Sequence, residues 1–280
     1  MILFTGRGTS GSWQVRGVQL GKACGAEVKA RANIQDCKSA DRIVVVKRVA
    51  PDLLVAIRAA GRPWVLDVVD MYPQPLCTGW DQRKAIKWVK AQIAELQPTG
   101  VIWPNQRMRE DCDSGLPGMV LYHHCRPDAA INPIRERVAS VGYEGSPNYL
   151  GEWLEPIKAH CAERGWQFVI NPPSLADMDI VLACRGTDYN GYAQSHWKSN
   201  IKLANAHGTG TPFIGPKECG YTETQTGMEQ WMESPADLPD CLDRLSEQYH
   251  RQRVSKAFLA NRYTVNDAAR DLLKFVDVIK

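Results

Sequence analysis

Three cationic side chains in the second half of the chain have the types and the spacing to bind a concentrated negative charge. Lys198 and Lys202 lie four residues apart, about one turn of a helix, so both can face one ligand. Arg185 ends the apolar segment DIVLACR, and open α/β sheets bind ligands beyond the carboxyl ends of such strands. We expect these side chains to face one anionic ligand; a solvated helix edge is the alternative for the two lysines.

Carboxylates and histidines end two predicted strands in the first half. Asp70 ends the apolar segment WVLDVVD, and Asp67 lies in the same segment. A carboxylate at such a place can accept a proton from a hydroxyl if its pKa is suitable. His123 and His124 end a further predicted strand and can do the same chemistry near neutral pH. The alternative for the aspartates is structural, as a helix cap or as the partner of an arginine.

The glycine-rich loop GRGTSGS follows the first predicted strand and precedes a helix. Gly8, Ser10 and Gly11 fit a turn at which backbone amides approach an anion. The dinucleotide fingerprint also requires an acidic residue at the end of the second strand, whereas a later strand here carries Lys47 and Arg48. A tight turn without a ligand is the alternative.

The sequence predicts no metal site and no disulfide framework. The nine cysteines are scattered and include no C-x-x-C pair, and His123, His124 and Cys125 lack a second ligand cluster. The D-x-D pairs, which begin at Asp111 and Asp177, do not indicate a divalent metal. The N-terminal apolar run is too short for a signal peptide, and no stretch approaches a membrane span. We expect a cytoplasmic, metal-independent protein.

Short apolar runs that alternate with helical patterns must position these side chains. The 280 residues are 44% hydrophobic and 23% charged, which excludes disordered, collagen-like and coiled-coil chains. The alternation predicts an α/β protein with parallel strands. In the first half we expect strands at residues 2–5, 42–47, 64–69, 100–103 and 119–123, and helices at 51–60 and 81–96.

A second alternation begins near residue 139, after the polar, proline-containing segment 126–133. It predicts strands at residues 138–145, 166–171, 179–185 and 211–215, helices at 149–164 and 199–208, and a last amphipathic helix at 266–279. We therefore expect a first lobe at residues 1–138, a second lobe at 139–263 and a terminal helix at 264–280.

The segment KSNIKLANAHGTGTPFIG, followed by ECGYTE, resembles the donor-binding segment of GT-B glycosyltransferases. The segments VGYEGSPNYLGEW and DIVLACR also resemble parts of that donor lobe. The resemblance implies two Rossmann-like lobes that face a cleft, a terminal helix that crosses back to the first lobe, and a nucleotide-sugar donor, first of all a UDP-sugar. The donor-binding residues that we expect are Gly8, Ser10, Gly11, Gly145, Arg185, Lys198, Lys202, Asn205, Tyr221 and Glu223.

The chain departs from the pattern of many retaining members of the superfamily at two positions. Those members carry two glutamates eight residues apart, and here Trp197 and Asn205 stand in their places. The resemblance therefore leaves the stereochemical outcome open. It makes Asp70 the expected base, with Asp67 and then a histidine, His123 or His124, as further candidates.

The first lobe of a GT-B enzyme holds the acceptor, and here this half of the chain is the basic one. Residues 1–140 carry 20 Lys and Arg against 13 Asp and Glu, whereas the remainder carries 14 against 18. This asymmetry is typical of a surface that meets an anion, although solvated surface charges are the alternative. The expected acceptor-binding residues are Trp13, Arg83, Lys87, Lys90, Arg107 and Arg109.

Small bacteriophage DNA-base glucosyltransferases share the GT-B architecture, which makes a hydroxymethylated pyrimidine in DNA the first acceptor to consider. A base in a duplex has to be flipped out to reach such a cleft. A carbohydrate or other small-molecule acceptor is the alternative within the same fold. A two-lobed protein that binds a nucleotide or sugar without catalysis is the alternative from another class.

Overall fold

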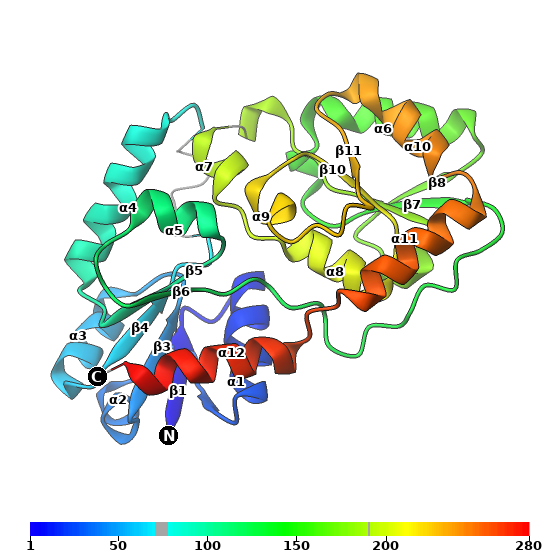
Figure 1. Cartoon of the computed structure of the whole chain (residues 1–280). Coiled ribbons are helices and arrows are strands. Elements are labelled where there is room, and N and C mark those ends of the chain that lie inside the picture. Colours follow the sequence, from blue (N-terminus) through cyan, green and yellow to red (C-terminus); the bar gives the residue numbers. More distant parts are fainter. Residues whose placement is uncertain (71–77, 190, 280) are drawn as a thin grey trace.

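The computed structural model describes residues 1–70, 78–189 and 191–279 and forms two α/β lobes (Figure 1). The strands of the first lobe are β1 (Ile2–Gly6), β2 (Glu27–Val28), β3 (Arg42–Val46), β4 (Trp64–Asp67), β5 (Gly100–Trp103) and β6 (Gly118–Val120). They form one parallel sheet in the order β2-β1-β3-β4-β5-β6.

The second lobe contains a smaller parallel sheet. Its strands are β7 (Ser140–Tyr143), β8 (Gln167–Ile170), β9 (Ile180–Leu182), β10 (Phe213–Gly215) and β11 (Gln230–Trp231), in the order β11-β10-β9-β7-β8. Two parallel-sheet lobes confirm the two-lobed Rossmann-like fold that the sequence predicts. Of the strands named here, β2 and β11 are two residues long and were not predicted, because so short a segment carries no periodic signal.

Helices flank both sheets. In the first lobe a π-helical turn (Trp13–Gln19) continues into α1 (Leu20–Ala23), followed by α2 (Ile34–Ser39), α3 (Pro51–Ala60), α4 (Gln82–Leu96) and α5 (Gln106–Cys112). The later helices are α6 (Leu154–Glu163), α7 (Tyr192–His196), α8 (Ile201–Thr209), α9 (Cys219–Thr222), α10 (Leu238–Arg244), α11 (Gln248–Ala260) and α12 (Val265–Val278).

Local sequence explains where the regular elements begin and end. Strand β3 reads RIVVV and its last four residues are buried, as expected of a parallel strand that helices cover on both faces. Helix α3 starts on Pro51 and ends at Gly61, whose φ of 62° lies in the left-handed region that glycine tolerates. Helix α4 is capped by Asp81, whose carboxylate accepts a hydrogen bond from the Lys84 amide at 2.7 Å.

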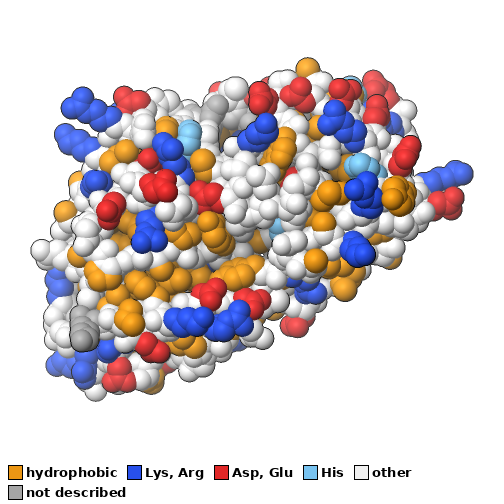
Figure 2. Space-filling model, in the orientation of Figure 1, with side chains coloured by type: hydrophobic (Ala, Val, Ile, Leu, Met, Phe, Trp, Pro, Cys, Tyr) orange, Lys and Arg blue, Asp and Glu red, His pale blue; other side chains and the backbone are white. Residues whose placement is uncertain are grey.

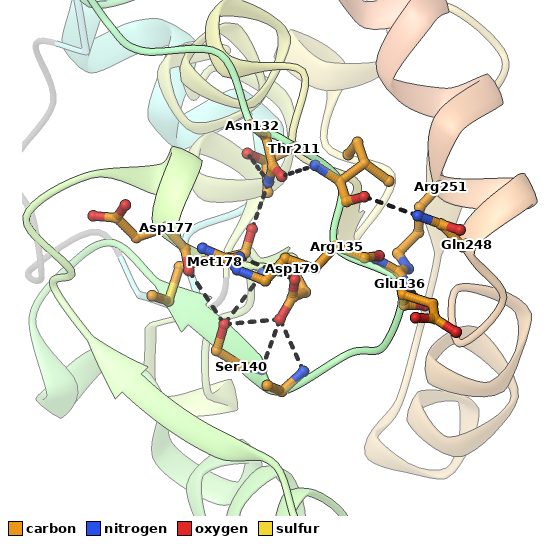
Figure 3. A network of polar contacts seen from close by, with 12 residues as sticks. Asn132, Arg135, Glu136, Ser140, Asp177, Met178, Asp179, Thr211, Gln248 and Arg251 are labelled. Carbon is orange, nitrogen blue, oxygen red and sulfur yellow. Dashed lines mark hydrogen bonds and ion pairs between the residues drawn. The ribbon is translucent and has the colours of Figure 1, made fainter.

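The chain that enters the second lobe is fixed to it by a polar network (Figure 3). The Asp179 carboxylate accepts hydrogen bonds from the Ser140 amide at 3.0 Å and from the Arg135 guanidinium at 3.1 Å. The Asn132 side chain donates to the Met178 carbonyl at 2.6 Å. Asp179, the second carboxylate of one D-x-D pair, therefore holds the start of β7 in place.

Helix α12 leaves the second lobe and lies along the first-lobe sheet, beside α1 (Figure 1). Its apolar face buries Ala269, Leu272 and Val276 in the cluster that contains Phe4 and Val44 of β1 and β3. The predicted return of the terminal helix to the first lobe is confirmed. The chain thus crosses between the lobes once before β7 and again before α12.

Truncating Leu272 to alanine is expected to destabilise the protein by about 2–5 kcal/mol, because a fully buried leucine leaves a cavity in the first-lobe core. Thermal unfolding measures the effect. Val278→Ala on the same helix is the matched control, because the Val278 side chain is 68% exposed and should change stability little. An unchanged melting temperature for Leu272→Ala would refute the docking of α12.

Candidate functional site

A cavity of about 540 Å³ lies between the lobes. Its wall includes residues within three positions after the ends of β4, β7 and β8, so it opens at the carboxyl ends of strands from both sheets, where α/β proteins bind ligands. Of the residues that the sequence singled out, the wall contains Gly11, Asp70, His123, His124, Gly145, Arg185, Lys198, Lys202, Asn205 and Tyr221.

Three cations from the second lobe converge on this cavity. The Lys202 ammonium lies 4.2 Å from the centroid of the Tyr143 ring, a cation–π contact. The Arg185 guanidinium forms two hydrogen bonds of 2.7 and 2.8 Å with the two carboxylate oxygens of Glu218. The Lys198 ammonium lies 3.5 Å from the Asp70 carboxylate across the cavity. The structure therefore brings together the three cations that the sequence spacing singled out.

Burial destabilises the charged forms of Lys198 and Lys202. Burial lowers the pKa of both Lys198 and Lys202 to about 8, with a further lowering by the charge of Arg185. An anion placed among them would offset this cost and favour their protonated forms. Perturbed lysines that converge in a cavity are typical of an anion-binding functional site.

The first lobe helps to position Lys198. Helix α7 packs on the first lobe, where the Trp197 side chain is buried in the first-lobe core and donates to Asp111 at 2.9 Å. The Asn105 side chain donates to the Lys198 carbonyl at 3.0 Å, and Asn200 accepts from the His123 amide at 2.8 Å. Contacts from the first lobe on both sides of Lys198 thus fix the backbone that carries it.

Asp70 projects its carboxylate between two ammonium groups. Lys47 pairs with one of its oxygens and Lys198 with the other. Burial by itself raises the pKa of the Asp70 carboxyl, but the charges of Lys198 and Lys47 outweigh it and hold the pKa below its ordinary value. Asp70 is therefore ionised near neutral pH, and its basicity depends on how strongly these lysines engage it.

Asp67 lies behind the cavity rather than in it. Its side chain is fully buried, 3.2 Å from the Arg16 guanidinium, and accepts from the Val69 amide at 3.2 Å. The role of arginine-paired carboxylate, which the sequence left open, describes this geometry. Val69 has a φ of 55°, a strained value for a β-branched residue, and it directly precedes Asp70. Asp67 thus supports the turn that presents Asp70.

The two histidines occupy the cavity wall in different ways. His124 has its Nδ1 2.8 Å from the Cys125 carbonyl and its Nε2 3.2 Å from the Val15 carbonyl, so neither nitrogen faces a ligand. Burial lowers the pKa of His124 and lowers that of His123 further. The His123 Nδ1 is buried and has no hydrogen-bond partner among the described residues. Burial therefore favours the uncharged form of both rings.

Gly145 and Asn205 shape the second-lobe wall. The Asn171 side chain bonds both the amide and the carbonyl of Gly145, and a Cβ at Gly145 would lie 2.9 Å from the Tyr143 hydroxyl. Asn205 donates to Glu144 at 3.1 Å and accepts from the Arg126 amide at 3.1 Å. Asn205, in the place of the second glutamate, therefore joins the interlobe linker to the end of β7.

Glu223 contacts the other lobe instead of the cavity. Its carboxylate accepts from the backbone amides of Gln106 at 2.7 Å and Arg107 at 3.0 Å, and from the Tyr122 hydroxyl at 2.9 Å. The structure therefore uses Glu223 to cap α5 across the lobe boundary. The Arg107 guanidinium is also engaged, at 2.7 Å from the Tyr192 hydroxyl. The structure does not bring these two residues to the cavity.

Gly8, Ser10 and Trp13 line a neighbouring, smaller cavity on the first lobe. The Trp13 indole is buried in the core beneath the glycine-rich loop, which leaves little of the ring to stack on a base. The Ser10 hydroxyl accepts from the Trp13 amide at 3.2 Å, as in a helix cap. Of the glycine-rich loop residues named as candidates, Gly11 reaches the interlobe cavity.

The predicted basic stripe lies on an outer surface. Arg83, Lys87 and Lys90 are exposed on α4, and Arg109 is exposed on α5. Figure 2 shows basic side chains at the outer edge of the first lobe, where Figure 1 draws α4. None of these four belongs to the described wall of the interlobe cavity.

Lys47, Tyr143 and Glu218 were not among the predicted site residues. The sequence did hold a signal for Lys47. Lys47 and Arg48 end a predicted strand at a place where dinucleotide-binding folds carry an acidic residue. Tyr143 and Glu218 gave no signal, because a strand tyrosine and a loop glutamate become cavity residues only through long-range packing.

The described residues 1–70, 78–189 and 191–279 contain no group of three or more His, Cys, Asp or Glu side chains that could hold a metal ion. In the same ranges, every helix is too short or too polar to cross a membrane.

No known family model matches the chain, and no curated protein matches it by sequence. Its fold matches several solved structures over almost the full length. One is HepE of Anabaena in complex with UDP and glucose, at 11% identity with a TM-score of 0.68, covering 99% of each chain. Another is AviGT4, a glycosyltransferase involved in avilamycin A biosynthesis, at 10% identity with a TM-score of 0.61, covering 100% of this chain and 98% of that one.

The UDP-GlcNAc 2-epimerase of Neisseria meningitidis bound to UDP-GlcNAc also matches, at 9% identity with a TM-score of 0.56, covering 98% of this chain and 99% of that one. At these identities the likeness establishes the fold. The chain has the GT-B architecture.

Proposed function

We propose that this protein is a glycosyltransferase that uses a nucleoside-diphosphate sugar, first of all a UDP-sugar. The observation that supports it best is the convergence of Lys198, Lys202 and Arg185 on a cavity between two GT-B lobes. HepE, of the same fold, binds UDP and glucose. Most of the donor contacts fall to the second lobe, and the acceptor lies against the first.

The diphosphate leaving group gains negative charge as the bond to the sugar breaks. The cations Lys198, Lys202 and Arg185 are fixed before the donor arrives, and they stabilise that developing charge in a partly water-excluded site. The Lys202 ammonium is stabilised most by the donor, because its contact with the Tyr143 ring is replaced by an ion pair with the diphosphate. The proposed reaction therefore needs no metal ion to neutralise the diphosphate.

The Asp70 carboxylate accepts the proton of the acceptor hydroxyl. Held by Lys47 and Lys198, it is a weak base in the unliganded protein. A bound diphosphate attracts the Lys198 ammonium and weakens its hold on Asp70, which raises the basicity of the carboxylate. The base thus becomes effective once the donor is in place.

A hydroxymethylated pyrimidine in DNA is the acceptor that we propose to test first. The exposed basic residues Arg83, Lys87 and Lys90 on α4 favour it, because their spacing suits a phosphate backbone. They lie outside the described cavity wall, so they would hold the duplex and the flipped base would enter the cleft.

The proposed function is tested by incubating the protein with labelled nucleotide sugars in excess chelator, with and without hydroxymethylated DNA. Release of free nucleotide, with label transferred to an acceptor, is the expected result. Conversion of the donor to an epimer, detected by NMR, would contradict transfer and favour an epimerase. Binding of donor with no turnover for any acceptor would favour a non-catalytic binding protein, and loss of activity with chelator would contradict metal independence.

UDP binding is expected to weaken above pH 8. Deprotonation of Lys198 and Lys202 removes charges that the diphosphate requires, and each has a pKa of about 8 in the unliganded protein. Affinity should fall by about threefold from pH 7 to 8, because each lysine is half deprotonated at its pKa, and then by up to about 10-fold per pH unit for each lysine. Calorimetric titration measures this, and Lys202→Arg, always charged, should halve the logarithmic slope, because Lys198 still titrates. A flat wild-type profile to pH 9.5 would show that these lysines do not bind the diphosphate.

A further inference from the structure

A second cavity, of about 260 Å³, opens on the first lobe at the carboxyl ends of β1 and β3. Four basic side chains contribute to its wall, and the wall as described contains no acidic residue. We call this cavity the first-lobe basic pocket; its basic residues are Arg7, Arg31, Lys47 and Arg48.

The arginines of the first-lobe basic pocket have no counter-charge in the part of the chain that the structure describes. Arg7, Arg31 and Arg48 are exposed, and no described carboxylate lies within ion-pair distance of them. The neighbouring Asp36 pairs with Lys29 at 2.6 Å. Like charges gathered around a hollow repel one another, and an anion in the hollow relieves that repulsion.

Strained backbone holds these side chains together. Arg31 has a φ of 53° and Lys47 a φ of 66°, both in the left-handed region that non-glycine residues seldom adopt. Gly8 has a φ of 88°, and a Cβ there would lie 2.6 Å from the Cβ of Ala30. Backbone strain at residues that gather like charges is typical of a ligand site.

The first-lobe basic pocket adjoins the interlobe cavity. Lys47 lines the pocket, and its ammonium pairs with the Asp70 carboxylate, which lines the interlobe cavity. The glycine-rich loop connects the same two spaces, because Ser10 lines the pocket and Gly11 the cavity. An anion in the pocket therefore lies on the acceptor side of the cleft, one ion pair away from the proposed base.

We propose that the first-lobe basic pocket binds a phosphate group of the acceptor and so places the acceptor hydroxyl next to Asp70. This inference rests on the proposed transferase function and names its substrate class, an acceptor that carries a phosphate near the reacting hydroxyl. Arginine suits phosphate because its planar donors form paired hydrogen bonds. A phosphorylated sugar or polyol and the phosphodiester backbone of DNA share this chemistry.

The test is a calorimetric titration of inorganic phosphate into protein saturated with UDP, at low ionic strength. The variant carries Arg7→Gln and Arg48→Gln, two exposed substitutions that leave the core intact. The variant is expected to bind phosphate at least about 10-fold more weakly than the wild type, because charge-assisted hydrogen bonds are lost. The matched control carries Arg253→Gln and Lys256→Gln, two exposed substitutions on α11 outside the described walls of both cavities, and should keep wild-type phosphate affinity. Equal phosphate affinity in all three proteins would overturn the proposal.

Competition identifies the source of the phosphate. Hexose and polyol phosphates in one arm, and a short DNA duplex in the other, are tested for displacement of bound inorganic phosphate. Displacement in either arm supports the proposal and names the acceptor, whereas displacement in neither overturns it. UDP affinity is measured in parallel and should be unchanged by Arg7→Gln and Arg48→Gln. If UDP does not bind the wild type, the proposed function is contradicted. The phosphate proposal is then tested by the same titration in the absence of UDP.

Discussion

The Lys202→Met variant is expected to lose about 10- to 100-fold in affinity for UDP, while the unliganded protein unfolds at the same or a higher temperature. A hydrogen bond between charged groups contributes about 1.5–3 kcal/mol, which sets the loss. The Lys202 ammonium is also costly in the empty site, because burial and Arg185 lower its pKa to about 8. Methionine has a similar volume and keeps the contact with the Tyr143 ring without the charge.

Opposite changes in binding and stability separate a ligand-binding role from a structural one. Calorimetry measures the affinity and thermal unfolding the stability. Lys158→Met is the matched control, because Lys158 is exposed on α6 and pairs with the exposed Glu155. Wild-type UDP affinity in Lys202→Met would show that the diphosphate does not bind where we place it.

The Asp70→Asn variant is expected to reduce turnover by about 10²- to 10⁴-fold, the usual contribution of a general base. UDP affinity should persist or increase, because the amide no longer competes with the diphosphate for the Lys198 ammonium. Steady-state turnover and UDP binding are measured on the same preparation. A loss of turnover without a loss of binding would identify Asp70 as acting in the chemical step.

Two further aspartates provide the comparison. Asp52→Asn, at the exposed start of α3, should change neither quantity. Asp67→Asn leaves the buried Arg16 without its counter-charge and is expected to lower the melting temperature instead. Wild-type turnover in Asp70→Asn would remove Asp70 from the mechanism.

The architecture could be predicted because it follows from local patterns. Residues 100–103 and 51–60 have the predicted bounds, since each pairs a strong apolar pattern with clear ends. The expected strand at 119–123 is β6 and ends at Val120, because His123 and His124 leave the sheet to line the cavity. An apolar pattern predicts the existence of a strand well. It predicts less well the residue at which the strand ends and a functional loop begins.

Site residues could be predicted where a single segment of the chain carries several of them. They could not be predicted where segments distant in the sequence come into contact. Lys198 and Lys202 are close in sequence, so their spacing alone placed them on one side of a ligand. Glu223 and Arg107 were assigned to donor and acceptor, yet Glu223 accepts from the Arg107 amide at 3.0 Å across the lobe boundary. A carboxylate that caps a helix of another lobe has the same sequence signature as one that faces a ribose.

The cap that Glu223 forms on α5 bears on how substrates come and go. If the lobes part, the Gln106 and Arg107 amides lose their acceptor and must be hydrated together, while Tyr122 loses its bond in the same event. Separation of the lobes at this place therefore requires the loss of all three hydrogen bonds. If the proposed transferase releases its nucleotide through such an opening, Glu223, which is outside the described cavity wall, would contribute to the rate of that release.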